Sequence, residues 1–305
     1  MPNPTGFCNI RFVKFAFLFS AFAALTASSL FSADIPALEA KAKQGDPAAQ
    51  FELARDYLKG EGVEKNAKRA FELASSAAGK GNVESKALLG YLYLKGTGTT
   101  KDEAKAQTLL QEAADKGSAK AAYNLGIVLA GKGEMSEAVI RLNKASDAGL
   151  LEAQLLLGDW YFFGDKGIQF DYEKAFPQYL KAAKQGSAKA QNAVGYMLSS
   201  GKGTAVNPHD AMEWLLKAVA QGDIQAEANL ANLYLNGEAV PTDYVEVLRL
   251  LILSSSKGNP YAKGILRQLL PGMSREDVAA AVENSGVKFK NPATLDIEDS
   301  LISPK

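Results

Sequence analysis

Two residue types that build metal sites and reactive centres are almost absent from this 305-residue chain. It contains one cysteine, Cys8, and one histidine, His209. Protein metal sites need clustered histidine, cysteine and carboxylate side chains. The composition therefore predicts no metal site, no cofactor and no catalytic group. His209 follows Pro208 at the expected start of a helix, where we expect it to be solvated.

The chain also lacks an excess of charge of either sign. Lysine and arginine together number 34, aspartate and glutamate together number 34, and the formal net charge is zero. Proteins that bind nucleic acid need a clustered basic face, since phosphate neutralisation supplies most of the binding energy. We therefore expect no nucleic-acid partner.

Long apolar runs are confined to the N-terminus. Arg11 and Lys14 precede an apolar stretch that ends in small residues, which is the pattern of a secretory signal. We predict that residues 1–33 are a signal peptide and that the product is an exported bacterial protein, periplasmic or secreted, without any cysteine. The alternative is an uncleaved inner-membrane anchor through residues 15–31, the one way in which we expect the chain to contact a membrane.

Glycine recurs at nearly equal intervals through the rest of the chain. The spacings between successive glycines of this set are 36, 36, 32, 37, 36 and 36 residues. A fixed period of this length indicates a repeat array, in which each unit packs only on its neighbours. The seven glycines are Gly45, Gly81, Gly117, Gly149, Gly186, Gly222 and Gly258.

Each interval has the pattern of two helices separated by a glycine-containing turn. In residues 82–117, apolar side chains recur at helical spacing, Gly96 and Gly98 interrupt them, and a second helical run ends at Gly117. Glycine suits the left-handed backbone that often ends a helix. Small residues at one position of the first helix should let the two helices approach closely; they are Ala54, Gly90, Gly126, Gly158, Gly195 and Ala231.

The second helices repeat alanine at two further positions, which we predict to be contact points between successive hairpins. The first set is Ala70, Ala106, Ala138, Ala175 and Ala211, and the second set is Ala77, Ala113, Ala145, Ala182 and Ala218. The expected N-caps are Asp46, Asn207, Asn259, Ser118, Ser187, Ser136 and Ser274.

The recurring motif is x-Ala-x-x-x-Leu-Gly-x-x-Tyr-x-x-Gly-x-Gly, followed by Lys-Ala pairs before the closing glycine. It resembles the Sel-1-like repeat (SLR) family, a relative of the tetratricopeptide repeats. The resemblance implies an all-α fold, a right-handed superhelical α-solenoid of stacked antiparallel helix hairpins. It also implies a role as adaptor or scaffold. Residues that carry it in one unit are Leu89, Gly90, Tyr93, Gly96, Gly98 and Ala106.

The predicted organisation is a signal peptide or anchor at 1–33, a solenoid at 34–283 and a flexible tail at 284–305. Pro177 lies inside an expected second helix, which we expect it to kink or open. The units are about 46–81, 82–117, 118–149, 150–186, 187–222 and 223–258, with a partial unit and a capping helix at 259–283.

Motifs that resemble catalytic ones have simpler explanations in this array. The Gly-x-Gly pairs recur at the same turn of successive units and complete no phosphate-binding fingerprint. Ser199-x-x-Lys202 and Ser254-x-x-Lys257 match the Ser-x-x-Lys pattern of penicillin-recognising enzymes, but the other motifs of those enzymes are absent. We therefore predict that the protein is not an enzyme.

Variable positions next to the packing residues of the first helices should line a concave groove. They combine aromatic, amide and charged side chains, which are common in recognition surfaces. We predict that this groove binds a peptide or protein partner, although individual tyrosines could instead pack between hairpins. The predicted groove residues are Arg55, Tyr91, Tyr123, Asp159, Asn192, Tyr196 and Asn232.

One dense aromatic run, residues 160–163, has two alternatives. Phe162 and Phe163 could form an exposed contact patch, or they could fill the junction beside Pro177, which we favour.

The functional prediction is an exported, non-enzymatic scaffold that binds a peptide or partner protein. The alternative is a cell-envelope enzyme or a binder of β-lactam or peptidoglycan-type ligands. Some exported SLR proteins linked to β-lactams carry a disulfide in each repeat, and this chain lacks those cysteines. A third possibility is a regulator tethered by an uncleaved N-terminal helix.

Overall fold

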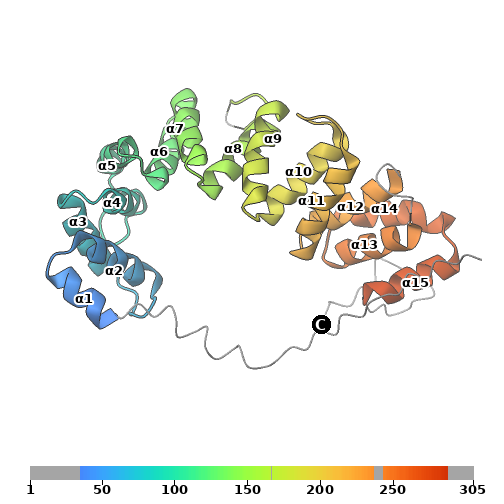
Figure 1. Cartoon of the computed structure of the whole chain (residues 1–305), viewed down its shortest axis with the longest axis horizontal. Coiled ribbons are helices and arrows are strands. Elements are labelled where there is room, and N and C mark those ends of the chain that lie inside the picture. Colours follow the sequence, from blue (N-terminus) through green and yellow to red (C-terminus); the bar gives the residue numbers. More distant parts are fainter. Residues whose placement is uncertain (1–34, 166, 237–242, 288–305) are drawn as a thin grey trace, which may run out of the picture. The chain divides into compact units, whose positions relative to one another are not determined.

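The computed structural model describes residues 35–165, 167–236 and 243–287. Residues 1–33 of the predicted signal and 288–305 of the predicted tail lie outside them. The described residues form fifteen α-helices, one 3-10 turn and no strand (Figure 1), which confirms the all-α prediction. The helices are α1 (Ile35–Lys43), α2 (Pro47–Lys59), α3 (Ala67–Gly79), α4 (Val83–Lys95), α5 (Glu103–Asp115), α6 (Ala119–Gly131), α7 (Met135–Asp147), α8 (Leu151–Phe163), α9 (Tyr172–Lys184), α10 (Ala188–Ser200), α11 (Pro208–Ala220), α12 (Ile224–Asn236), α13 (Tyr244–Ser256), α14 (Pro260–Leu269) and α15 (Arg275–Ser285); η1 (Leu270–Gly272) lies between the last two.

The chain divides into two compact units. In the first, made of residues 35–82 and 97–99, α2 packs on α1 and on α3. The turn at 97–99 lies directly on the start of α3. A Cβ atom at Gly98, whose φ is +70°, would overlap the carbonyl of Ala67. This glycine is therefore needed for a close backbone approach.

The second unit, residues 83–96 and from 100 onward, is a stack of helix hairpins. Each first helix packs most extensively on the second helix of its own hairpin: α4 on α5, α6 on α7, α8 on α9, α10 on α11 and α12 on α13. Successive hairpins meet where α5 packs on α6, α7 on α8, α9 on α10 and α11 on α12. This consecutive packing is the architecture of an α-solenoid.

The C-terminal helices complete the stack in the second unit. Both α14 and α15 pack on α13, and Val278 and Ala281 of α15 are buried there. Ser274 caps α15 by accepting from the Asp277 backbone amide. The helix continues to Ser285, two residues into the segment predicted as a tail.

The alanine positions of the second helices are fully buried in the core. Every member of the two predicted sets has an exposed fraction of 0%, and Val247 and Ser254 occupy the same positions in the last hairpin with the same value. Larger side chains could not be accommodated without moving the hairpins apart, since protein interiors are close-packed. The alanines are therefore core positions. In the first set, the carbonyls of Ala106, Ala138 and Ala211 lie beside the small residue of their own hairpin's first helix. Contact between successive hairpins at these alanines stays a prediction.

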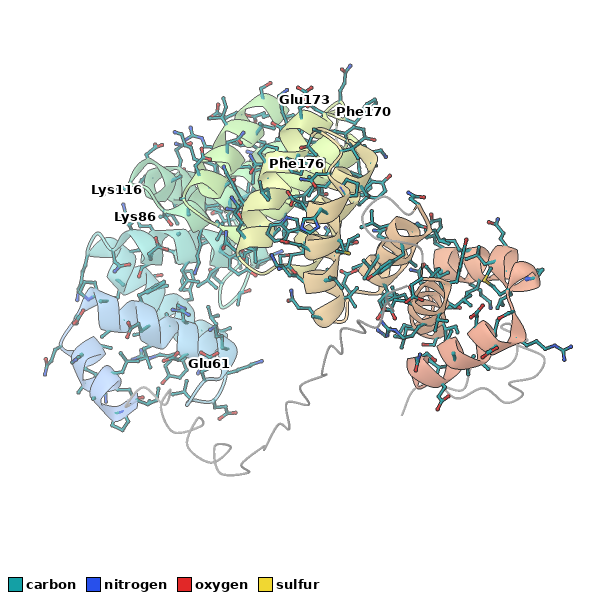
Figure 2. All side chains as sticks on the ribbon, turned by 45° about the vertical axis from the view of Figure 1, so that its right-hand side comes forward. Glu61, Lys86, Lys116, Phe170, Glu173 and Phe176 are labelled. Carbon is teal, nitrogen blue, oxygen red and sulfur yellow. The ribbon has the colours of Figure 1, made fainter. Side chains whose placement is uncertain are left out.

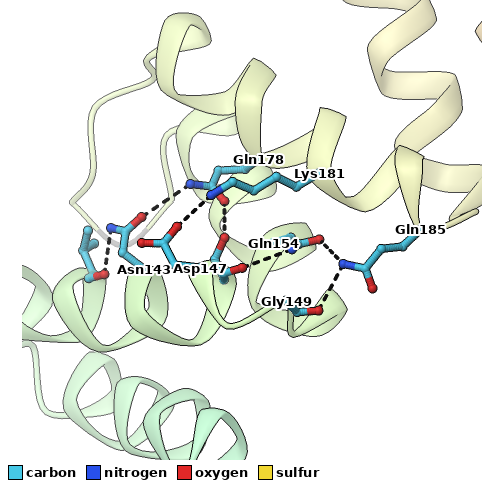
Figure 3. A network of polar contacts seen from close by, with 9 residues as sticks. Asn143, Asp147, Gly149, Gln154, Gln178, Lys181 and Gln185 are labelled. Carbon is cyan, nitrogen blue, oxygen red and sulfur yellow. Dashed lines mark hydrogen bonds and ion pairs between the residues drawn. The ribbon is translucent and has the colours of Figure 1, made fainter. Parts of the chain in front are cut away.

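Buried glutamines join two hairpins of the second unit to the hairpin before each. In Figure 3, the Gln154 side-chain amide donates to the Ser146 carbonyl at the end of α7 at 3.1 Å and accepts from Gln185 at 2.8 Å. Gln191 and Gln221 repeat the arrangement one hairpin later. The partners are main-chain carbonyls at helix ends, which also accept backbone N–H bonds from Gly149 and Gly186, so each glutamine adds a second bond there.

The helix ends follow most of the sequence predictions. All seven closing glycines have positive φ, between 81° and 94°. Six of the seven predicted N-caps make the expected side-chain bond. Ser136 is the exception, because α7 already begins at Met135. The prediction that Pro177 opens its helix is wrong: α9 is continuous. Glu173, whose carbonyl loses its helical partner, is exposed, so water can replace the missing bond.

Candidate functional site

One groove in the second unit combines two of the predicted groove residues, Tyr196 and Asn232. It has a volume of about 660 Å³ and lies over the first helices α10 and α12 and the start of α14. None of the lining residues within the described part of the chain carries a charge. The lining residues are Tyr196, Ser199, Ser200, Asn229, Asn232, Leu233, Leu235, Asn236 and Tyr261.

Hydrogen bonds between neighbouring helices hold the groove side chains. The Asn232 amide donates to the Tyr261 hydroxyl at 2.9 Å, which joins α12 to α14. The Asn229 amide donates to Asn192 on α10 at 2.8 Å. Asn192, another predicted groove residue, thus supports the groove from beside it. Since both amides are held by partners on other helices, their orientations are set before any ligand arrives.

The Tyr196 ring separates this groove from an aromatic cluster. Its hydroxyl accepts from the Lys202 ammonium at 2.7 Å, and this hydrogen bond raises the pKa of Lys202. The same ammonium lies 4.8 Å from the Tyr196 ring centroid and 5.2 Å from that of Tyr172. A cation over several ring faces is electrostatically favourable. Lys202 therefore fixes Tyr196 at the border of the groove.

The aromatic run of residues 160–163 divides between the two alternatives. Phe162 packs on the core and contacts the rings of Tyr172, Tyr179 and Tyr196. Phe163, by contrast, is 71% exposed. Phe162 thus fills the junction, as favoured, while Phe163 does not.

A second hollow lies on the turn side of the same hairpins. It is bounded by Phe170 and Glu173, which lie near each other where the turn meets α9 (Figure 2), and by Gly201, Gly203 and Thr204 of the next turn. Phe170 is 67% exposed. The volume of this second hollow is about 710 Å³.

The other predicted groove residues lie outside the groove. Asp159 accepts from the Tyr179 hydroxyl at 2.7 Å and from Lys189 at 2.6 Å, so it joins α8 to α9 and α10. Burial and this hydrogen bond raise the pKa of Tyr179. Tyr123 is half-buried, and burial raises its pKa.

The last two predicted groove residues, Tyr91 and Arg55, lie on other first helices, α4 and α2. Tyr91 on α4 is 39% exposed, with the Lys95 ammonium 5.9 Å from its ring centroid. Arg55 belongs to the first unit, where its guanidinium lies 5.8 Å from the Phe51 ring centroid.

Sequence reasoning missed Asn229, Asn236 and Tyr261. A signal for the asparagines was available, because residues 229, 232 and 236 follow the i, i+3, i+7 spacing of one helix face. Tyr261 carried no such signal, since it belongs to the next hairpin.

The described ranges contain neither a candidate metal site nor a candidate membrane-spanning helix. There, no group of three or more histidine, cysteine or carboxylate residues could hold a metal ion. No helix in those ranges combines the length and apolar character needed to cross a membrane. His209 is exposed, with Glu213 3.8 Å away.

The Sel1 repeat family model matches this chain six times, at residues 47–82, 83–118, 119–149, 151–187, 188–223 and 224–259. Together these matches cover more than half of the chain. The chain belongs to the Sel1 repeat family. This membership agrees with the motif resemblance and with the stacked hairpins.

Curated relatives share parts of the Sel1 array. A chitin synthase regulatory factor 3 of Schizosaccharomyces pombe is 37% identical over 98 residues, which is 32% of this chain and 10% of the relative. The chitin synthase regulator SKT5 of Saccharomyces cerevisiae is 34% identical over 190 residues, 61% of this chain and 23% of the relative. The chain thus spans less than a quarter of the length of either.

A solved Sel1 repeat protein from Oxalobacter formigenes has a similar structure. The TM-score is 0.57 at 26% sequence identity, and the match covers 70% of this chain and 89% of that one. The repeat architecture is therefore shared along most of that protein.

Proposed function

We propose that this Sel1 repeat protein is a non-enzymatic scaffold that binds a partner protein along the first-helix side of its hairpins. The observation that carries the proposal is the uncharged groove over α10, α12 and α14, which has two tyrosines and three asparagines in its lining. Tyrosine is a common anchor of protein interfaces, and amides supply adaptable hydrogen bonds. The two curated relatives have names that describe regulators of another protein, which also favours a scaffold.

Export is part of the same proposal. The apolar N-terminal stretch with Arg11 and Lys14 supports a signal peptide, and the repeats contain no cysteine that would need a reducing compartment. N-terminal sequencing of the protein purified from cells that make it tests this. A mature chain that begins within residues 28–34 supports export with a cleaved signal peptide, whereas a chain that begins at Met1 contradicts the cleavage and leaves the uncleaved anchor.

The binding proposal is tested by comparing two variants in affinity capture from the native envelope fraction, with mass spectrometry. The first, the row variant, carries Tyr91→Ala, Tyr123→Ala and Tyr196→Ala. The control carries Ile140→Ala and Leu216→Ala, which remove exposed apolar side chains from second helices. We expect the row variant to lose partners that wild type and control both retain, with helical circular dichroism unchanged in all three.

The result against the proposal is equally specific. If a folded row variant captures the same partners as wild type, the first-helix side does not bind them. Because Tyr123 is half-buried, a second row variant with Tyr123→Phe keeps the test valid if the first is unstable.

A further inference from the structure

Three asparagines form a stripe along one face of α12. Asn229, Asn232 and Asn236 are three and four residues apart, so they lie on the same side of the helix. All three line the 660 Å³ groove. With a rise of 1.5 Å per residue, the stripe extends about 10 Å along the helix axis. This set is called the asparagine stripe below.

The hydrogen bonds within the groove leave part of the stripe available. Asn229 and Asn232 each donate one hydrogen bond, to Asn192 and Tyr261 respectively. An asparagine side chain has two N–H donors and a carbonyl acceptor. Each of these two amides therefore keeps one donor and its acceptor. Asn236 is exposed and makes no side-chain hydrogen bond within the described residues.

The walls of the groove are also uncharged. Tyr196, Ser199 and Ser200 come from α10, and Tyr261, 54% exposed, comes from α14. The hydroxyls of Ser199 and Ser200 are bonded to the carbonyl of Tyr196 in their own helix. Apart from the Lys202 ammonium, which bonds the Tyr196 hydroxyl at the border, the described lining offers a charged ligand group no opposite charge, so its loss of water is costly.

We propose that the asparagine stripe binds the main chain of an extended, uncharged peptide segment of the partner. This inference rests on the proposed scaffold function. A peptide unit presents one N–H and one C=O, which is the pairing that a side-chain amide can satisfy. An extended chain advances about 3.3 Å per residue, so the stripe matches about three residues. The two tyrosines flank this segment.

Main-chain binding has a clear consequence for specificity. The partner segment is selected by its lack of charge and its extended shape rather than by one residue type. Substituting one uncharged side chain for another should change the affinity little, whereas blocking the backbone N–H groups should weaken binding strongly.

The test uses the full chain and two sets of fluorescein-labelled ten-residue peptides. One set contains only alanine, serine, threonine, glutamine and valine, and the other has lysine or glutamate at every second position. The stripe variant carries Asn229→Ala, Asn232→Ala and Asn236→Ala. The matched control is Asn124→Ala, because Asn124 on α6 occupies the same repeat position as Asn229 and is also half-buried, outside the groove.

We expect uncharged peptides to bind wild type more tightly than charged ones. The stripe variant should bind the best peptide at least tenfold more weakly, at about 1 kcal/mol per hydrogen bond lost. Asn124→Ala should stay within about twofold of wild type, since it removes none of these bonds. Backbone N-methylation at alternate positions of that peptide should weaken binding by about tenfold.

Several outcomes overturn the inference. These are no binding of uncharged peptides, tighter binding of charged ones, equal affinity in the stripe variant, or binding of chito-oligosaccharides in place of peptides. If the stripe variant unfolds, the single Asn236→Ala change decides, because this exposed side chain supports no other residue. It should weaken binding by about threefold.

The two proposals fail separately. If peptides do not bind as expected but the row variant loses its captured partners, only the stripe inference fails. If the row variant keeps those partners, the scaffold proposal fails whatever the peptides do.

Discussion

Replacing Gly195 by alanine should destabilise this protein, although the same change usually stabilises a helix. In an unstrained helix interior, alanine is favoured over glycine by about 0.5–1 kcal/mol. At Gly195 on α10, however, the added Cβ atom would lie 2.6 Å from Cγ of Leu215 and 3.1 Å from the Ala211 carbonyl oxygen. Leu215 is fully buried, so it has no space to move into.

The expected magnitude follows from these two opposing effects. Overpacking a close-packed core costs about 1–3 kcal/mol. Subtracting the helix preference leaves a net loss of up to about 2.5 kcal/mol in the free energy of unfolding for Gly195→Ala. Gly264 on α14 is the control, because it is also helical but has no atom within 4 Å of its added Cβ. Gly264→Ala should gain about 0.5–1 kcal/mol.

Urea unfolding followed by circular dichroism measures both values. The double variant Gly195→Ala with Leu215→Ala adds a further check. Leu215→Ala alone should cost about 2–5 kcal/mol, and the double variant should cost less than the sum of the two changes, since the new methyl group occupies part of the cavity. The reasoning is refuted if Gly195→Ala raises the unfolding midpoint, or if the two losses add in full.

Two further predictions concern side-chain contacts. Gln191→Ala should lower the free energy of unfolding by about 1–3 kcal/mol, because it removes the hydrogen bond that Gln191 donates to the Ala183 carbonyl and the one that it accepts from Gln221; an unchanged urea midpoint would contradict this. Lys202→Met should destabilise by about 1 kcal/mol near neutral pH, through loss of the bond to Tyr196 and of the ring contacts. The pKa of Lys202 is raised in the folded state, so the stabilisation that Lys202 provides is fully present below the ordinary lysine pKa. The difference in unfolding free energy between wild type and Lys202→Met should therefore shrink as the pH rises above about 10. A difference that grows above that pH would contradict the prediction.

The helical framework could be predicted from local pattern because each unit repeats the same physical solution. The positions of Ala211 and Ala218 have an equivalent in every hairpin. A role assigned to one such position can therefore be compared with the same position in the other hairpins. The N-cap prediction was wrong where a unit departs from the repeat pattern. The third hairpin has a shorter turn, so α7 begins before Ser136.

The candidate site was predictable only in part. Repeat register correctly placed Tyr196 and Asn232 on the first helices, and both line the groove. Register alone could not show that Asp159 is bonded to Tyr179 and Lys189. Whether a polar side chain faces a ligand or a neighbouring helix depends on the partners that the next hairpins supply.

The amino-acid sequence by itself determined the period, the two-helix unit, the buried alanine positions and the left-handed glycines, because each depends on residues within one or two repeats. Only the tertiary structure decided where an uncharged groove opens. Asn229 and Asn232 lie on α12 and Tyr261 lies on α14 of the next repeat unit, and the hydrogen bond from Asn232 to Tyr261 forms only when the two repeat units stack. Packing between units therefore converts a periodic pattern into one particular surface.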